Sequence, residues 1–156
     1  MTGVQTCALP IWHGQEYVEL TGSDREQAGL SVMYLIGRDY GSGARSWDAG
    51  RLAAELDVPG IALAPVLDRL ERSGLIVATE KAQFVPGRDP EGILLADILD
   101  AVRTLQISRV PVEVNAAASV APVMREVHGA MRERLGARSL KDLIASKEKD
   151  GVGAET

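Results

Sequence analysis

Residues 47–87, WDAGRLAAELDVPGIALAPVLDRLERSGLIVATEKAQFVPG, decide the fold. Leu52 and Leu56 lie one turn apart in a short helical pattern, which VPG at 58–60 interrupts, and a second helical pattern ends at Gly74. LIVAT and QFVPG are then two short β-type runs, and the polar EKA between them indicates a hairpin. Helix, turn, helix and hairpin in this order predict a winged helix-turn-helix.

Helical patterns also flank this stretch on both sides. Upstream, SDREQAGLSVMYLIGRDYGSG predicts a helix with Ser23 as its N-cap, and Ser46 is expected to cap the helix that follows. We expect Pro65 in the first turn of the helix after VPG, where its missing N–H does no harm. Asp89 and Pro90 predict the start of a further helix, PEGILLADILDAVRT.

The C-terminal third adds helices to this domain. Residues 13–104 are expected to form the winged-helix domain, residues 105–118 a linker, residues 119–146 two helices, and residues 147–156 a disordered polar tail. The expected fold class is therefore mainly α with a small β-hairpin, a winged helix-turn-helix plus C-terminal helices. The last helix carries apolar residues that must bury against the domain or against a second copy: Leu140, Leu143 and Ile144.

The first residues, MTGVQTCALPIW at 1–12, show neither helical nor strand period. They resemble the in-frame translation of a common sequencing-library adapter, read with GTG as the start codon. We therefore expect genuine sequence to begin near His13 and to extend further upstream, which makes the chain a C-terminal fragment. The lone cysteine, Cys7, would then be artefactual, and the fragment would hold no disulfide or thiolate metal site.

Composition describes an acidic chain with a core of aliphatic side chains. Of its 156 residues 46% are hydrophobic and only 4% aromatic, and the formal net charge is −5. An acidic balance gives no bulk attraction to nucleic acid or to an anionic membrane surface. The longest apolar runs fall well short of the roughly 20 residues that span a bilayer, so the visible chain is expected to be soluble.

The expected DNA-reading surface lacks the chemistry of DNA binding. Base edges are read by polar or cationic side chains near the start of the second helix of the motif, where this chain has PGIALAPV. Arg69 and Arg72 each follow an acid, and the hairpin carries a single lysine, Lys81. Residues 48–104 hold six Lys/Arg against ten Asp/Glu, a net charge of −4, which opposes contact with phosphates.

No pattern of catalytic or ligand-binding residues stands out. His128 lies in an amphipathic helical pattern with no second ligand at metal-binding spacing, and the GSGA at Gly41 follows a helix and lacks a phosphate-loop lysine. Arg88 and Asp89 have structural interpretations, as an ion-pair partner and a helix cap. We therefore predict no catalytic residue, no cofactor and no metal site.

The segments LAAELDVP, LDRLERSGLI, FVPGRDPEGILLADIL and MRERLGARSLKDLIA resemble the cytoplasmic C-terminal region of the YihY/BrkB family of bacterial inner-membrane proteins. The resemblance implies a soluble domain on the cytoplasmic face of the inner membrane, joined to a multi-helix membrane domain upstream. The family has carried a ribonuclease BN label, and no metal-ligand motif here supports it. The expected role is a non-catalytic interaction or regulatory module that binds a protein partner or a second copy.

ILLADILDAVR and RSLKDLIA are also similar to Rrf2-type transcriptional regulators, which join a winged helix to later helices. This second resemblance implies DNA binding. The chain departs from it by lacking the cysteine cluster of an iron–sulfur centre and the Gly-Gly-Tyr wing. A DNA-binding regulator of this type is the alternative to the membrane-protein module.

Overall fold

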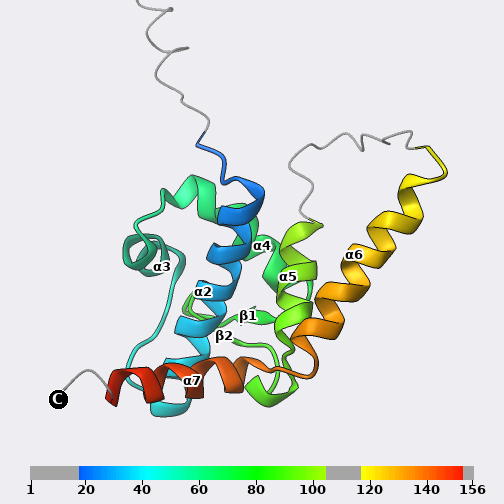
Figure 1. Ribbon diagram of the computed structural model, residues 1–156. Helices are drawn as coiled ribbons and strands as arrows, with labels where there is room; N and C mark the ends of the chain where they lie inside the picture. Colours follow the sequence, from blue (N-terminus) through cyan, green and yellow to red (C-terminus); the bar gives the residue numbers. More distant parts are fainter. Residues whose placement is uncertain (1–17, 105–116, 153–156) are drawn as a thin grey trace, which may run out of the picture.

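The computed structural model describes residues 18–104 and 117–152, with elements labelled as in Figure 1. In chain order these are α2 (Gly22–Ser42), α3 (Ala49–Leu56), α4 (Gly60–Arg72), β1 (Ile76–Ala78), β2 (Phe84–Pro86), the 3-10 turn η1 (Pro90–Gly92), α5 (Leu95–Arg103), α6 (Val120–Leu135) and α7 (Leu140–Val152). The fold is a winged helix-turn-helix with additional C-terminal helices, and the predicted fold class is confirmed.

Helix α2 is the centre of the core. It packs against α3 and α4, against α5, against β2, and against α7, which crosses near its C-terminal end (Figure 1). Its apolar stripe includes Val32, Met33 and Ile36, all at most 1% exposed. The helical spacing of these side chains explains why one helix can face several partners.

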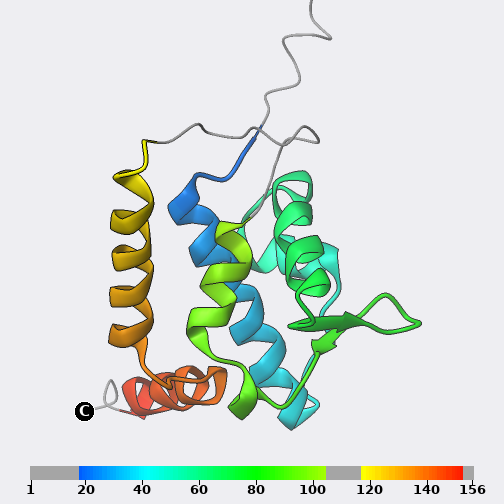
Figure 2. The ribbon, with the colours of Figure 1, turned by 90° about the vertical axis from the view of Figure 1, so that its right-hand side faces the viewer.

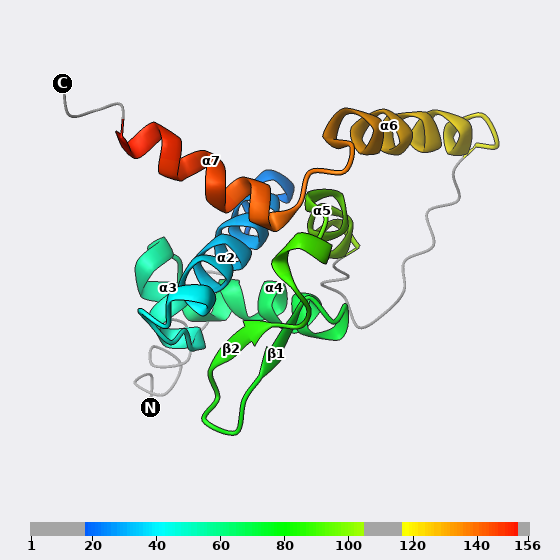
Figure 3. The same cartoon turned by 90° about the horizontal axis from the view of Figure 1, so that it is seen from below.

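The wing is a two-stranded antiparallel hairpin in which Ile76 is paired with Pro86 and Ala78 with Phe84. Trp47 extends this sheet by one bridge, because the backbone N–H of Phe84 donates to the Trp47 carbonyl oxygen at 2.7 Å. The hairpin projects away from the helices (Figure 3).

The C-terminal helices attach to the domain through α7. The backbone N–H of Leu140 donates to the Ile93 carbonyl at 2.8 Å, and the Leu140 side chain is completely buried. Leu143 and Ile144 pack against the same core. Of the two expected arrangements for these three residues, the structure shows the one in which they fold back on the domain.

Gly37 of α2 permits this close approach of α7. A Cβ atom there would lie 3.0 Å from Leu140 Cδ2 and 3.1 Å from Ile144 Cδ1.

Helix α6, unlike α7, contributes no buried residue and stands beside the domain (Figure 2). Ion pairs from Arg132 to Asp97 and Asp100 on α5 hold its C-terminal half.

Two predicted helix caps are wrong by two residues. The N-cap of α2 is Thr21 and not Ser23: its hydroxyl accepts from the Asp24 backbone N–H at 3.2 Å, and the Asp24 carboxylate accepts from the Thr21 N–H. The N-cap of α3 is Asp48 and not Ser46, since its carboxylate accepts from the backbone N–H of Arg51 at 2.9 Å. A threonine hydroxyl in α2 and an aspartate carboxylate in α3 are thus the acceptors that serines were expected to supply.

Other predicted boundaries also shift. Pro65 lies inside α4, beyond the first turn, because α4 already begins at Gly60. Asp89 does cap a helical segment, but that segment is the short turn η1, and the chain is extended at Ile93 before α5 begins. Helix α7 runs to Val152 through part of the segment expected to be a disordered tail. Residues 1–12 and most of the predicted linker lie outside the described residues.

A buried carboxylate joins the end of α2 to the start of the helix-turn-helix. Asp39 is 4% exposed, and its oxygens accept from Arg38 Nε at 2.7 Å, from Arg38 Nη2 at 2.9 Å and from Trp47 Nε1 at 2.9 Å. The hydrogen bonds from Arg38, and then that from Trp47, hold the pKa of Asp39 below its usual value. Asp39 therefore stays ionised in the folded protein.

We expect Asp39→Asn to destabilise the domain near neutral pH by about 1–2 kcal/mol, because the neutral amide loses charge-assisted bonds to a half-exposed arginine. The lowered pKa makes this stabilisation fully present above the unfolded-state pKa, about 3.9, and lost as pH falls through the lower folded-state pKa. Urea unfolding against pH should thus show the two proteins converging in acid. Asp57→Asn, at an exposed carboxylate, is the matched control. A constant difference down to the lowest pH would contradict this account.

Candidate interaction surface

The helix-turn-helix is formed by α3 and α4 and the short turn between them. Asp57 ends α3 in the left-handed conformation, with φ of 53°, which reverses the chain toward Pro59 at the N-cap of α4. One face of α4 anchors the motif in the core through Ala62, Leu63, Val66, Leu67 and Leu70, all of them buried. The opposite face is thereby presented to solvent.

The solvent face of α4 begins with apolar residues. Ile61 is 80% exposed, and Ala64 and Pro65 lie on the same exposed side. Pro65 has no N–H, so it cannot donate to the carbonyl of Ile61 as an ordinary helical residue would. The first turns of α4 therefore offer apolar side chains and one backbone acceptor, and no side chain that donates to a base edge.

The arginines of α4 are engaged within the protein. Arg69 Nε donates to the carbonyl oxygen of Ala101 on α5 at 3.1 Å. Arg72 pairs with Asp68 one turn earlier, with Nε 3.0 Å from Oδ2. Glu71 is exposed beside them. Along α4, which the structure describes in full, the outer face is thus apolar at its start and close to neutral at its end.

The wing adds little positive charge. Its loop between β1 and β2 exposes Glu80 and Lys81 together, and Val77 on β1 is 48% exposed. A hairpin that contacts DNA normally supplies cations to phosphates, and the strength of that contact follows the number of phosphates neutralised. The loop of the wing therefore exposes one cation beside one acid.

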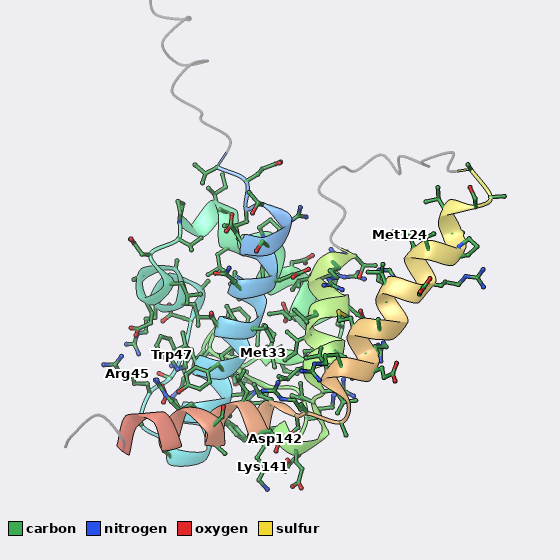
Figure 4. All side chains as sticks on the ribbon, in the orientation of Figure 1. Met33, Arg45, Trp47, Met124, Lys141 and Asp142 are labelled. Atoms are coloured by element: carbon green, nitrogen blue, oxygen red, sulfur yellow. The ribbon has the colours of Figure 1, made fainter. Side chains whose placement is uncertain are left out.

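Besides Arg38 and Asp39, three groups among the described residues have shifted pKa values, and each takes part in a surface hydrogen bond or ion pair. The carboxylate of Glu91 raises the pKa of Lys141, with which it pairs at 3.0 Å, and the backbone N–H and hydroxyl of Ser139 lower the pKa of Asp142 (Figure 4). Asp100 raises the pKa of Arg132 across α5 and α6. These pairs are contacts between neighbouring surface groups.

Residues considered as candidate ligands in the sequence are dispersed. His128 is exposed on α6, and Gly43 of the GSGA segment ends α2 with φ of 63°. Within residues 18–104 and 117–152, no group of three or more His, Cys, Asp or Glu side chains is placed to hold a metal ion. In the same described ranges, no helix is long and apolar enough to cross a membrane.

Comparison with known proteins gives one similarity in sequence and several in structure. No protein-family profile matches the chain. A UPF0761 membrane protein of Rhodospirillum rubrum is 33% identical over 107 residues, which are 65% of this chain and 24% of that protein. The chain thus spans about a quarter of the length of this relative.

Solved structures of transcriptional regulators are similar to most of the chain. The global cysteine regulator CymR of Bacillus subtilis aligns with a TM-score of 0.57 at 20% identity, over 83% of this chain and 98% of CymR. IscR of T. potens aligns with a TM-score of 0.60 at 16% identity, over 86% and 91% of the two chains. The oxidized form of Staphylococcus aureus CymR aligns at 0.58 and 20% identity, over 80% and 96%. These similarities establish the shared winged-helix fold.

Proposed function

We propose that this chain is a winged-helix protein-interaction domain of a YihY/BrkB-like membrane protein, placed on the cytoplasmic face of the inner membrane and without catalytic activity of its own. The observation that carries the proposal is the outer face of α4, where Ile61 is 80% exposed, Arg69 is bonded to Ala101 and Arg72 is paired with Asp68. The sequence similarity to a UPF0761 membrane protein supports the membrane attachment.

An exposed apolar surface at this place suits a protein partner. The centres of protein–protein interfaces are depleted in charge and enriched in apolar side chains, while DNA interfaces are strongly cationic. Ile61, Ala64 and Pro65 form such a centre, and the Asp68–Arg72 pair lies beside it as a polar rim. The partner would contact the first turns of α4, the position from which other helix-turn-helix proteins read DNA.

The second candidate function is DNA binding as an Rrf2-type regulator. The solved structures named above are transcriptional regulators, and their similarity covers at least 80% of this chain. These structural similarities support the DNA-binding candidate more directly than they support the membrane-protein module. Against it stand the apolar start of α4 and the net charge of −4 over residues 48–104.

The upstream reading frame distinguishes the two candidates. Sequencing the genomic DNA across the codons before His13 should reveal, in the same frame, several apolar segments of roughly 20 residues. A start codon close to His13 with no apolar segment before it would overturn the membrane-protein proposal and favour the regulator.

A further inference from the structure

A cavity of about 430 Å³ lies beside the helix-turn-helix, away from the outer face of α4. It is formed where the end of α2, the segment 44–47 and β2 meet. Its apolar lining comes from the buried Ile36 and Trp47 and from the partly exposed Phe84, and Arg45 also lines it. Arg45 and Trp47 lie on the same side of the molecule (Figure 4). The cavity is large enough for a small organic molecule.

Hydrogen bonds hold the polar wall of the cavity in place. Arg51 Nη1 donates to the Ser46 carbonyl oxygen at 3.0 Å, and Gln83 Nε2 donates to Ser46 Oγ at 3.1 Å. Together with the bridge between Trp47 and Phe84, these bonds fix the segment before α3 against β2. A ligand would therefore meet a wall that is already ordered, which reduces the entropy lost on binding.

Two arginines line the cavity, Arg45 and Arg51, and both side chains are 62% exposed. Arg51 also pairs with Asp48 on the rim, with Nε 3.5 Å from Oδ2. Arg45 makes only a long ion pair of 3.7 Å to Glu55, so its guanidinium is able to turn to a ligand at small cost. Asp39, the acid that lines the cavity, is bonded by Arg38 and by the Trp47 indole, which offset its charge.

We propose that this cavity binds a small organic carboxylate with an apolar body. The Arg45 guanidinium pairs with the carboxylate, because its planar fork matches the two oxygens, and Arg51 adds a second positive charge nearby. The apolar body lies against the partly exposed Phe84, next to the buried Trp47. The proposal rests on the cavity alone and holds whichever partner α4 contacts.

Binding at this place would join α2, the segment 44–47 and β2, and would stabilise the folded domain by mass action. Trp47 is the tryptophan of the described residues, so a Trp12→Phe background makes fluorescence a local reporter. The probes are benzoate, 3-phenylpropanoate and 4-methylpentanoate, with 3-phenylpropanamide as the neutral counterpart of the second. We expect a saturable change in Trp47 fluorescence and a raised Tm with at least one carboxylate.

The charge of the probe and of Arg45 should both matter. We expect the amide, and separately Arg45→Ala, to bind roughly tenfold more weakly or worse, the size expected for loss of a charge-assisted hydrogen bond. Arg45→Lys should lose less, since it keeps the charge without the fork. Arg125→Ala, at an exposed arginine of α6, removes the same net charge and should bind as the parent does. Circular dichroism checks that each variant is folded.

Three results would overturn the proposal. The first is the absence of saturable binding by all three carboxylates at millimolar concentration. The second is equal binding of 3-phenylpropanoate and its amide, and the third is equal weakening by Arg45→Ala and Arg125→Ala.

Discussion

Gly87→Ala should destabilise the domain by about 3 kcal/mol or more, one of the two largest effects expected of a single substitution here. A Cβ atom at residue 87 would lie 2.2 Å from the carbonyl oxygen of Gly74 and 2.9 Å from its carbonyl carbon. Both are backbone atoms and cannot turn aside. The Gly87 N–H also donates to the Leu75 carbonyl at 2.9 Å, so moving the chain apart would break a bond that closes the base of the wing.

Gly92→Ala is the matched control for this variant. It makes the same chemical change five positions later, and nothing lies within 4 Å of the added Cβ. Its stability should stay within about 0.5 kcal/mol of the parent in urea unfolding. If Gly87→Ala were equally mild, the close crossing of the residue 74 and residue 87 backbones would be wrong, and with it the described base of the wing.

Leu140→Ala should cost about 2–5 kcal/mol, because it removes a completely buried side chain and leaves a cavity. Leu140 comes from α7, which is distant in sequence from the helix-turn-helix, yet its side chain reaches Gly37 on α2. The decrease in the free energy of unfolding therefore tests whether α7 is part of the same cooperative unit as the winged helix. Urea unfolding followed by circular dichroism measures it.

Val123→Ala is the control for Leu140→Ala, since Val123 lies on α6 and is 56% exposed. It should change stability by less than about 0.5 kcal/mol. Measurements at several protein concentrations complete the test. If α7 packed on a second copy, the loss in Leu140→Ala would vary with protein concentration, whereas packing within one chain predicts a constant loss.

Much of the fold was readable from local patterns. The change from helical to strand period after Gly74 gave the wing, and the breaker VPG gave the turn between α3 and α4. Cap positions were less readable, because Thr21 and Ser23, or Ser46 and Asp48, are both good N-caps two residues apart. At α3 a tertiary bond distinguishes the two: Ser46 accepts from Gln83, which directly precedes β2, and Asp48 caps α3.

The outer face of α4 could be predicted from the sequence, whereas the cavity beside the helix-turn-helix could not. The apolar start of α4 was readable, because Ile61, Ala64 and Pro65 are neighbours on one helix whose other face is clearly the core. The cavity was not predicted, because its walls come from α2, the segment 44–47 and β2. Only the long-range bridge between Trp47 and Phe84 brings these segments together, and no local pattern encodes it.

Binding to DNA is the measurement that tests the central claim most directly, namely that the outer face of α4 is a protein-contact surface. Fluorescence anisotropy of a labelled duplex pool of random sequence, at about 20 mM and about 150 mM salt, should show no saturable binding at micromolar protein. The variant Asp68→Lys/Glu71→Lys should gain binding that weakens with salt, since it adds cations on this face. Micromolar or tighter binding by the unaltered chain, with log K falling linearly against log salt, would contradict the claim and favour the DNA-binding regulator.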